Sequence, residues 1–189
     1  MLFLIVHIMF KNMFWKKKKN KKFTCSQCGE IHSEWPALAY NSPSSYYNLS
    51  ENEKINIAKI NDDFCEIEYD SQTDRFIRVI LIQKVNDFDQ NLEYGLWVSL
   101  SEKSYTDYQA NFNNSNHENS YFGWLSNYLP NYEFSESIPM TVFAQKGNNR
   151  PEIVPHSEFN HPFVEDYYNG ISKEEAERRI HQMIKNSTK

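Results

Sequence analysis

The stretch FIRVILI at residues 76–82 decides the fold class, because it is a nearly continuous run of β-branched and other large apolar residues in the middle of the chain. Such a run is typical of a central strand with both faces buried, and we predict a strand over residues 75–85. Arg78 interrupts the run. We expect its guanidinium to pair with Glu66 or Glu68 on a neighbouring strand, in preference to binding an anion.

Alternating patterns on either side of this run predict its partner strands. In residues 64–69 and 94–100 every second side chain is apolar, as in half-buried strands. A third alternation at residues 138–144 is followed by a Gly-Asn-Asn turn at 147–149 and an apolar run at 151–154, which predicts a β-hairpin. The sequence therefore predicts a mainly antiparallel central sheet of about five strands.

Helices are predicted around this sheet from their N-cap residues. Capping boxes at Ser50 and Ser172 begin a helix over residues 51–60 and the last helix of the chain, and Ser101 begins a helix over residues 102–113. Helices and strands do not alternate regularly along the chain. The fold class is therefore α+β, with flanking helices around the sheet.

The chain has 189 residues, of which 40% are hydrophobic, and we expect one α+β domain over residues 23–189. Residues 1–22 form an apolar and basic extension, which we expect to be disordered or a mis-assigned start, with translation beginning at Met9 or Met13. Its apolar run is too short to span a bilayer, and its charges follow the run, unlike those of a secretory signal. We therefore predict a cytoplasmic protein without a transmembrane span.

Charge is divided unevenly between the extension and the body. Residues 1–22 hold seven lysines and no acidic residue, so the remainder carries 13 basic and 25 acidic residues, a formal charge of −12. An acidic body repels phosphate backbones, which excludes nucleic-acid binding by the folded domain and suits a basic protein partner. The lysines at 16–22 leave open a separate association with nucleic acid or a membrane surface.

A candidate metal site lies near the amino end, where Cys25-Ser26-Gln27-Cys28-Gly29 is followed by His32. A C-x-x-C turn lets two thiolates bind one zinc ion, and the glycine after it allows the backbone to turn back. We therefore expect an N-terminal cysteine knuckle with a structural zinc, held by Cys25, Cys28 and His32. Redox-active or simply unliganded thiols are the alternatives.

Tetrahedral zinc needs a fourth ligand, and we assign His161 to this position, with His156 and Cys65 as alternatives. His161 precedes Pro162 and also fits a helix-capping role. Cys65 also fits a buried core thiol, because it lies on the apolar face of its predicted strand.

Two tryptophans lie off the main apolar stripes. Trp97 points away from the apolar face of its predicted strand, and Trp124 lies between Phe122 and Leu125. Such residues form either a groove for a partner or a second core layer beneath a covering helix.

Several short strings occur together in one order: C-x-x-C-G-E-x-H at 25–32, D-F-C at 63–65, F-I-R at 76–78, G-L-W-V-S-L-S at 95–101, Y-F-G-W-L at 121–125, H-P at 161–162 and G-I at 170–171. In this order they resemble the bacterial domain-of-unknown-function family 2199, over about residues 23–185. The resemblance implies a small stand-alone bacterial protein that opens with a cysteine knuckle. It transfers no activity and no catalytic residue.

The chain has no nucleophile elbow, no H-E-x-x-H and no phosphate-binding glycine loop. The sequence therefore favours a protein that is not an enzyme. The leading hypothesis is a non-enzymatic binding or regulatory module with a structural zinc knuckle. The alternatives are a metal-dependent enzyme with an open Cys/His site, and an acidic, immunity-like antagonist of a basic partner. The oligomeric state is not indicated.

Overall fold

The computed structural model describes residues 22–24 and 28–187, so the predictions for residues 1–21 and for Cys25 fall outside it. Ten strands are present in the described chain: β1 (Phe23–Thr24), β2 (Ile31–His32), β3 (Leu38–Ala39), β4 (Ala58–Ile60), β5 (Phe64–Glu68), β6 (Thr73–Gln83), β7 (Leu92–Leu100), β8 (Ser120–Leu125), β9 (Pro139–Gln145) and β10 (Asn149–Pro155). Strands β1 and β2 form a separate hairpin, and the other eight form one sheet in the order β3-β7-β8-β9-β10-β6-β5-β4.

Strands β6 to β10 close into a five-stranded barrel. Consecutive strands pair antiparallel from β6 to β10, and β10 returns to β6 through a parallel pair in which Glu152 lies opposite Ile80. An odd number of strands in up-and-down order must close in this way, because the first and last strands run in the same direction.

The α+β class is confirmed, and the predicted sheet is corrected. The sheet is mixed rather than mainly antiparallel, because β10–β6 and β3–β7 are parallel pairs, and it closes into a barrel instead of remaining an open sheet of about five strands. The β9–β10 hairpin is confirmed. Closure was missed because it depends on a contact between two strands about 70 residues apart, which no local pattern reports.

Apolar side chains from alternate positions fill the barrel. The inward residues of β6 and β7 face each other, as in the pairs of Ile77 with Val98 and of Val79 with Leu96. Position 123 of β8 requires glycine, because a Cβ there would lie 2.8 Å from the carbonyl oxygen of Ser99 on β7. These contacts make the barrel interior the main core of the protein.

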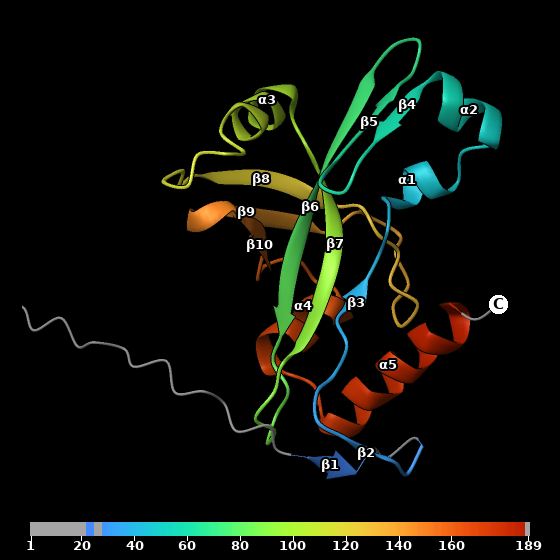
Figure 1. Ribbon diagram of the computed structural model, residues 1–189, viewed down its shortest axis with the longest axis vertical. Coiled ribbons are helices and arrows are strands. Elements are labelled where there is room, and N and C mark those ends of the chain that lie inside the picture. Colours follow the sequence, from blue (N-terminus) through green and yellow to red (C-terminus); the bar gives the residue numbers. More distant parts are fainter. Residues whose placement is uncertain (1–21, 25–27, 188–189) are drawn as a thin grey trace, which may run out of the picture.

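In the part of the chain that the structure describes, five helices surround the barrel: α1 (Ser44–Tyr47), α2 (Glu51–Asn56), α3 (Glu102–Ala110), α4 (Pro162–Asn169) and α5 (Lys173–Ser187), with a short 3-10 turn, η1 (Lys146–Asn148). Helix α3 covers one end of the barrel, and α4 and α5 lie at the other (Figure 1). None of the helices in the described residues is long and apolar enough to cross a membrane.

The predicted caps at Ser50 and Ser101 are present, but the helices that follow them end sooner than predicted, α2 at Asn56 and α3 at Ala110. Ser50 and Glu53 form the expected capping box, and Ser101 accepts a hydrogen bond from the Ser104 amide. The helix predicted over 51–60 ends at Asn56, because the next residues form β4 and pair with β5. Ladder hydrogen bonds outweigh helix propensity there.

A second, smaller core lies on the outside of the barrel. Cys65, Ile67, Phe76 and Trp97 project from the outer face of β5, β6 and β7 and are almost fully buried. We call this the covered face, because residues 40–60, including α1, α2 and β4, pack over it (Figure 1). Of the two roles predicted for the tryptophans, Trp97 takes the core role.

Candidate functional site

The residues on either side of the predicted cysteine knuckle form a short β-hairpin. Strands β1 and β2 pair with Phe23 opposite His32 and Thr24 opposite Ile31, and of the residues between them the structure describes 28–30. Among these, Cys28 is exposed and lies in a turn, and Gly29 has a φ of +75°, a left-handed conformation that favours glycine. Gly29 therefore has a conformation that lets the backbone turn directly after Cys28.

The hairpin is attached to the body of the protein through helix α5. Lys173 Nζ donates a hydrogen bond to the Thr24 carbonyl oxygen at 3.3 Å, and the same ammonium lies 5.6 Å from the centre of the Phe88 ring. Phe88 in turn stacks on Trp35, with 4.6 Å between ring centres. These contacts fix the hairpin beside the amino end of α5.

The described residues do not complete a metal site. Within residues 22–24 and 28–187, no three His, Cys, Asp or Glu side chains are grouped so that they could hold a metal ion. Two of the predicted ligands lie beyond this search, since neither Cys25 nor the side chain of His32 belongs to the described part. The zinc knuckle therefore stays a prediction.

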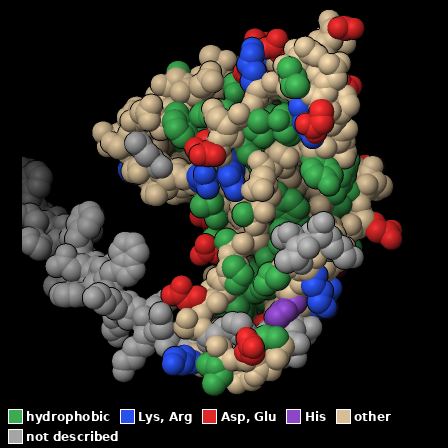
Figure 2. Space-filling model, turned by 45° about the vertical axis from the view of Figure 1, so that its right-hand side comes forward, with side chains coloured by type: hydrophobic (Ala, Val, Ile, Leu, Met, Phe, Trp, Pro, Cys, Tyr) green, Lys and Arg blue, Asp and Glu red, His purple; other side chains and the backbone are tan. Residues whose placement is uncertain are grey.

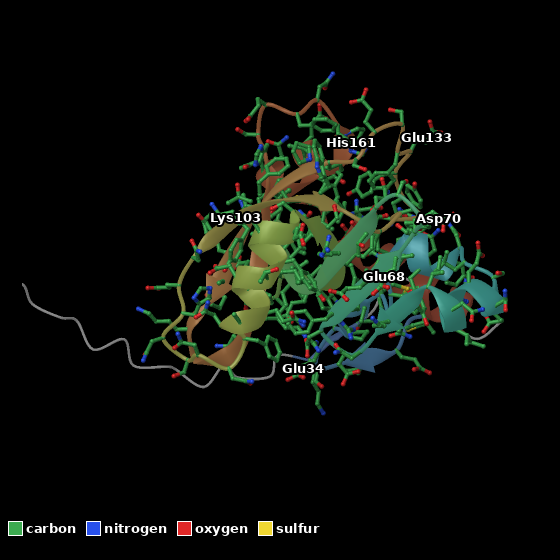
Figure 3. All side chains as sticks on the ribbon, turned by 90° about the horizontal axis from the view of Figure 1, so that it is seen from above. Glu34, Glu68, Asp70, Lys103, Glu133 and His161 are labelled. Carbon is green, nitrogen blue, oxygen red and sulfur yellow. The ribbon has the colours of Figure 1, made fainter. Side chains whose placement is uncertain are left out.

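His161, the predicted fourth ligand, caps helix α4. Its Nδ1 accepts a hydrogen bond from the Phe163 amide at 3.0 Å, and its Nε2 lies 2.9 Å from the Glu133 carbonyl oxygen (Figure 3). Both ring nitrogens therefore have backbone partners. In this arrangement the imidazole has the capping role that Pro162 suggested, and binding a metal would require it to break one of these bonds.

The two alternative fourth ligands are also engaged. Cys65 is fully buried in the second core, and burial raises the pKa of its thiol to about 12, which disfavours the thiolate that binds metal. His156 Nε2 lies 3.1 Å from the Thr141 hydroxyl, and its ring lies against Phe122 with 5.6 Å between ring centres.

Arg78 does not make the predicted ion pair, which is a correction. Glu68 pairs with Lys59 at 2.8 Å, and no carboxylate in the described residues lies within ion-pair distance of Arg78. Its guanidinium donates one long hydrogen bond of 3.4 Å to the Asp62 carbonyl oxygen. Burial and the neighbouring Arg150 lower its pKa. The prediction failed because β5 pairs with the first half of β6, which places Glu66 opposite Arg75.

A shallow hollow of about 490 Å³ lies beside α3, and its lining is polar with two aromatic rings: Asn61, Asp62, Asp63, Phe64, Gln109, Phe112 and Asn113. The carboxylate of Asp63 is bound by Arg150 at 2.8 Å. The side chain of Asp62 is exposed at a bend of the chain.

Three aromatic side chains project from the outer face of β8 and β9 and stay about half exposed. Phe122, Trp124 and Phe143 have exposed fractions of 48%, 44% and 41%. Phe122 and Trp124 meet edge to face, with 5.0 Å between ring centres. We call the surface formed by these three residues the open face. Trp124 is therefore not part of the second core, and the partner groove that its position suggested stays a prediction.

Buried charges elsewhere are paired with one another. Arg179 is almost fully buried and binds Asp166 and Glu175, each at 2.7 Å, while its guanidinium lies 5.0 Å from the centre of the Tyr132 ring. Hydrogen bonds from Arg178 and Arg179 lower the pKa of Glu175. This network joins α4 to α5 and has a structural role. Acidic side chains on the surface are spread out with hydrophobic ones between them, as Figure 2 shows for one face.

Comparison with known proteins gives one positive result. No curated protein and no solved structure matches the chain. The model of a family described as "Uncharacterized protein conserved in bacteria (DUF2199)" matches residues 24–171, which include the hairpin loop, the whole barrel and α4. The match covers most of the chain and agrees with the resemblance seen in its sequence strings. The chain therefore belongs to the DUF2199 family of uncharacterised bacterial proteins.

Proposed function

We propose that this protein is a non-enzymatic binding or regulatory module, whose amino-terminal hairpin holds a structural zinc ion. The observation that carries the proposal is the position of the C-x-x-C-G motif. It lies between Thr24 and Ile31, which pair with each other, and Gly29 directly after Cys28 has a left-handed backbone. A short connection between two paired strands suits two thiolates that bind the same ion.

Zinc in this position would stabilise a hairpin that has little core of its own. Each of its strands has two residues, and the contacts that join it to the body include a hydrogen bond from Lys173 to Thr24. A small unit of this kind commonly depends on a metal for its folding free energy. Cys25, Cys28 and His32 would supply three ligands. His161 would have to give up a backbone hydrogen bond to supply the fourth.

A binding role is supported by how the buried charges are used. Arg179, Asp166 and Glu175 neutralise one another between α4 and α5, and the Tyr132 hydroxyl also donates to Asp166 at 2.6 Å. Charged groups in closed networks of this kind stabilise packing. A catalytic carboxylate or arginine usually lies in a cleft with its reactive atoms accessible. We place the module in the cytoplasm, where reduced thiols remain available to a metal.

The exposure of Cys28 favours a second candidate, a metal-dependent enzyme with an open Cys/His site. Such a site keeps a water on the metal in place of a fourth protein ligand, whereas a structural zinc has four protein ligands. The absorption spectrum of the cobalt-substituted protein separates the two. A closed tetrahedral site is unaffected by added anions, and an open site changes when an anion replaces the water.

The test of the proposal is metal analysis of the full chain, purified without chelator. We expect about one zinc per chain, and we expect Cys25→Ser and Cys28→Ser each to lose it. Cys65→Ala is the matched control, because its thiol is buried in the second core, and it should retain zinc. A protein with no zinc, or zinc that survives both hairpin substitutions, would overturn the proposal.

A further inference from the structure

The open face is a built surface and not a chance exposure of single rings. Phe122 and Trp124 occupy alternate positions of β8, and Phe143 projects from the neighbouring strand β9, two residues after Thr141, which lies opposite Phe122. The Phe122 ring is held from two sides, by Trp124 at 5.0 Å and by His156 at 5.6 Å. The Phe122 ring is therefore packed between two other rings, while about half of its surface and that of Trp124 stays exposed.

Both strands are paired on each side over most of the open face. Strand β9 pairs with β8 and β10, and β8 pairs with β9 along residues 120–124 and with β7 at residues 123–125. At Trp124 and Phe143 a partner therefore makes contact through side chains and not by adding a strand to the sheet.

Carboxylates flank the aromatic rings. Glu152 of β10 lies opposite Phe143, and within the described residues its carboxylate has no hydrogen-bond or ion-pair partner. Glu158 is largely exposed and lies 3.8 Å from His156, the residue that packs on Phe122. Residues 23–189 carry a formal charge of −12, which favours cationic partners for the body of the protein as a whole.

We propose that the open face is the docking surface for an arginine- and lysine-rich segment of a partner protein. The inference rests on the proposed binding role and names its partner. Charge complementarity carries it, because cationic side chains are attracted to aromatic faces, most strongly to tryptophan, and to flanking carboxylates. An acidic or nucleic-acid partner would be repelled by the same charges. Trp124 is expected to make the largest contribution.

The experiment measures binding of a fluorescently labelled arginine–glycine repeat peptide to the full chain by anisotropy, with a glutamate–glycine repeat as the negative control. We expect Trp124→Ala to weaken binding roughly tenfold and Phe122→Ala to weaken it severalfold. Tyr47→Ala is the matched control, because Tyr47 is an exposed aromatic residue, 76% exposed, on α1 and outside the open face. It should leave binding unchanged.

A substitution of charge separates docking from general attraction. Glu152→Gln should weaken binding severalfold at low salt, and the effect should shrink as salt screens the carboxylate, while that of Trp124→Ala persists. The proposal is overturned if the arginine peptide does not bind, or if Trp124→Ala and Tyr47→Ala have equal effects. It is also overturned if the chain forms dimers that Trp124→Ala dissociates, because the occupant is then a second copy. Loss of zinc in Cys28→Ser with peptide binding intact would show that the two proposals stand independently.

Discussion

The covered face and the open face of the barrel begin from the same pattern and end in different environments. Trp97 and Trp124 both project outward from the barrel, from neighbouring strands, β7 and β8. Trp97 is fully buried, and its indole N–H donates to the Tyr40 carbonyl oxygen at 3.0 Å, whereas Trp124 is 44% exposed. The difference comes from residues 40–60, which pack over β5 to β7 and leave the open face of β8 and β9 half exposed. An outward tryptophan thus supports folding or recognition according to what the rest of the chain covers.

Replacing Trp97 should break the covered face with the largest effect on stability. Trp97→Ala removes a fully buried ring and leaves the Tyr40 carbonyl without its indole donor, so we expect a loss of about 3 to 5 kcal/mol in the free energy of unfolding. Chemical denaturation followed by circular dichroism measures this. A loss below about 1 kcal/mol would mean that the second core contributes little to the fold.

Cys65 reports on the same face through its chemistry. Burial raises the pKa of its thiol to about 12, so the reactive thiolate is scarce at pH 8 and becomes common only as the pH approaches 12. We expect alkylation of Cys65 at pH 8 to be about a thousandfold slower than that of an exposed cysteine. Mass spectrometry of the labelled peptides separates Cys65 from Cys25 and Cys28. In the Trp97→Ala variant the rate of Cys65 alkylation should rise. Rapid alkylation of Cys65 in the unsubstituted protein would contradict the burial of its thiol in the second core.

Asn127 links the covering segment, residues 40–60, to strand β7 through hydrogen bonds, and its replacement should have a smaller effect on stability than Trp97→Ala. Asn127 is buried, its Oδ1 accepts a hydrogen bond from the Trp97 amide at 2.7 Å, and its Nδ2 donates to the Ser42 carbonyl oxygen at 2.9 Å. Asn127→Ala leaves both backbone groups unpaired, and we expect a loss of about 1 to 3 kcal/mol in unfolding free energy. The matched control is Asn113→Ala, because Asn113 is an exposed asparagine on the surface. This substitution should change the free energy of unfolding by less than about 0.5 kcal/mol.

The sequence predicted local structure well, since the signals for local structure lie within a few residues. The β9–β10 hairpin and the caps at Ser50 and Ser101 are all present. Strand β8 was not predicted, because its outward residues Phe122 and Trp124 are as apolar as its inward ones and an inward glycine breaks the alternation. Barrel closure was also missed, since it depends on register between distant strands.

For the candidate sites, the sequence identified residue types but not their environment. The Cys25–Cys28 pair was predicted as a metal-binding turn, and of this motif the structure describes Cys28, which lies in a turn, and Gly29. Trp97 and Trp124 were predicted to be either core or groove residues, and sequence alone offered no way to separate them, because burial on the outer face depends on the path of residues 40–60. The ion pair predicted for Arg78 was wrong for a similar reason. The register between β5 and β6 decides which arginine lies opposite Glu66, and that residue is Arg75.

Trp124→Ala is expected to have the smallest effect on stability, and its comparison with Trp97→Ala distinguishes the open face from the covered face. Trp124 is half exposed, and among the described residues its one ring partner is Phe122, so Trp124→Ala should lower the free energy of unfolding by less than about 1 kcal/mol. Trp97→Ala, at an outward position of the neighbouring strand, should cost several times more. Denaturation of both variants under one set of conditions measures the difference. Equal losses would mean that both tryptophans serve the fold. A near-neutral Trp124→Ala that still loses the arginine peptide would separate recognition from folding at this residue.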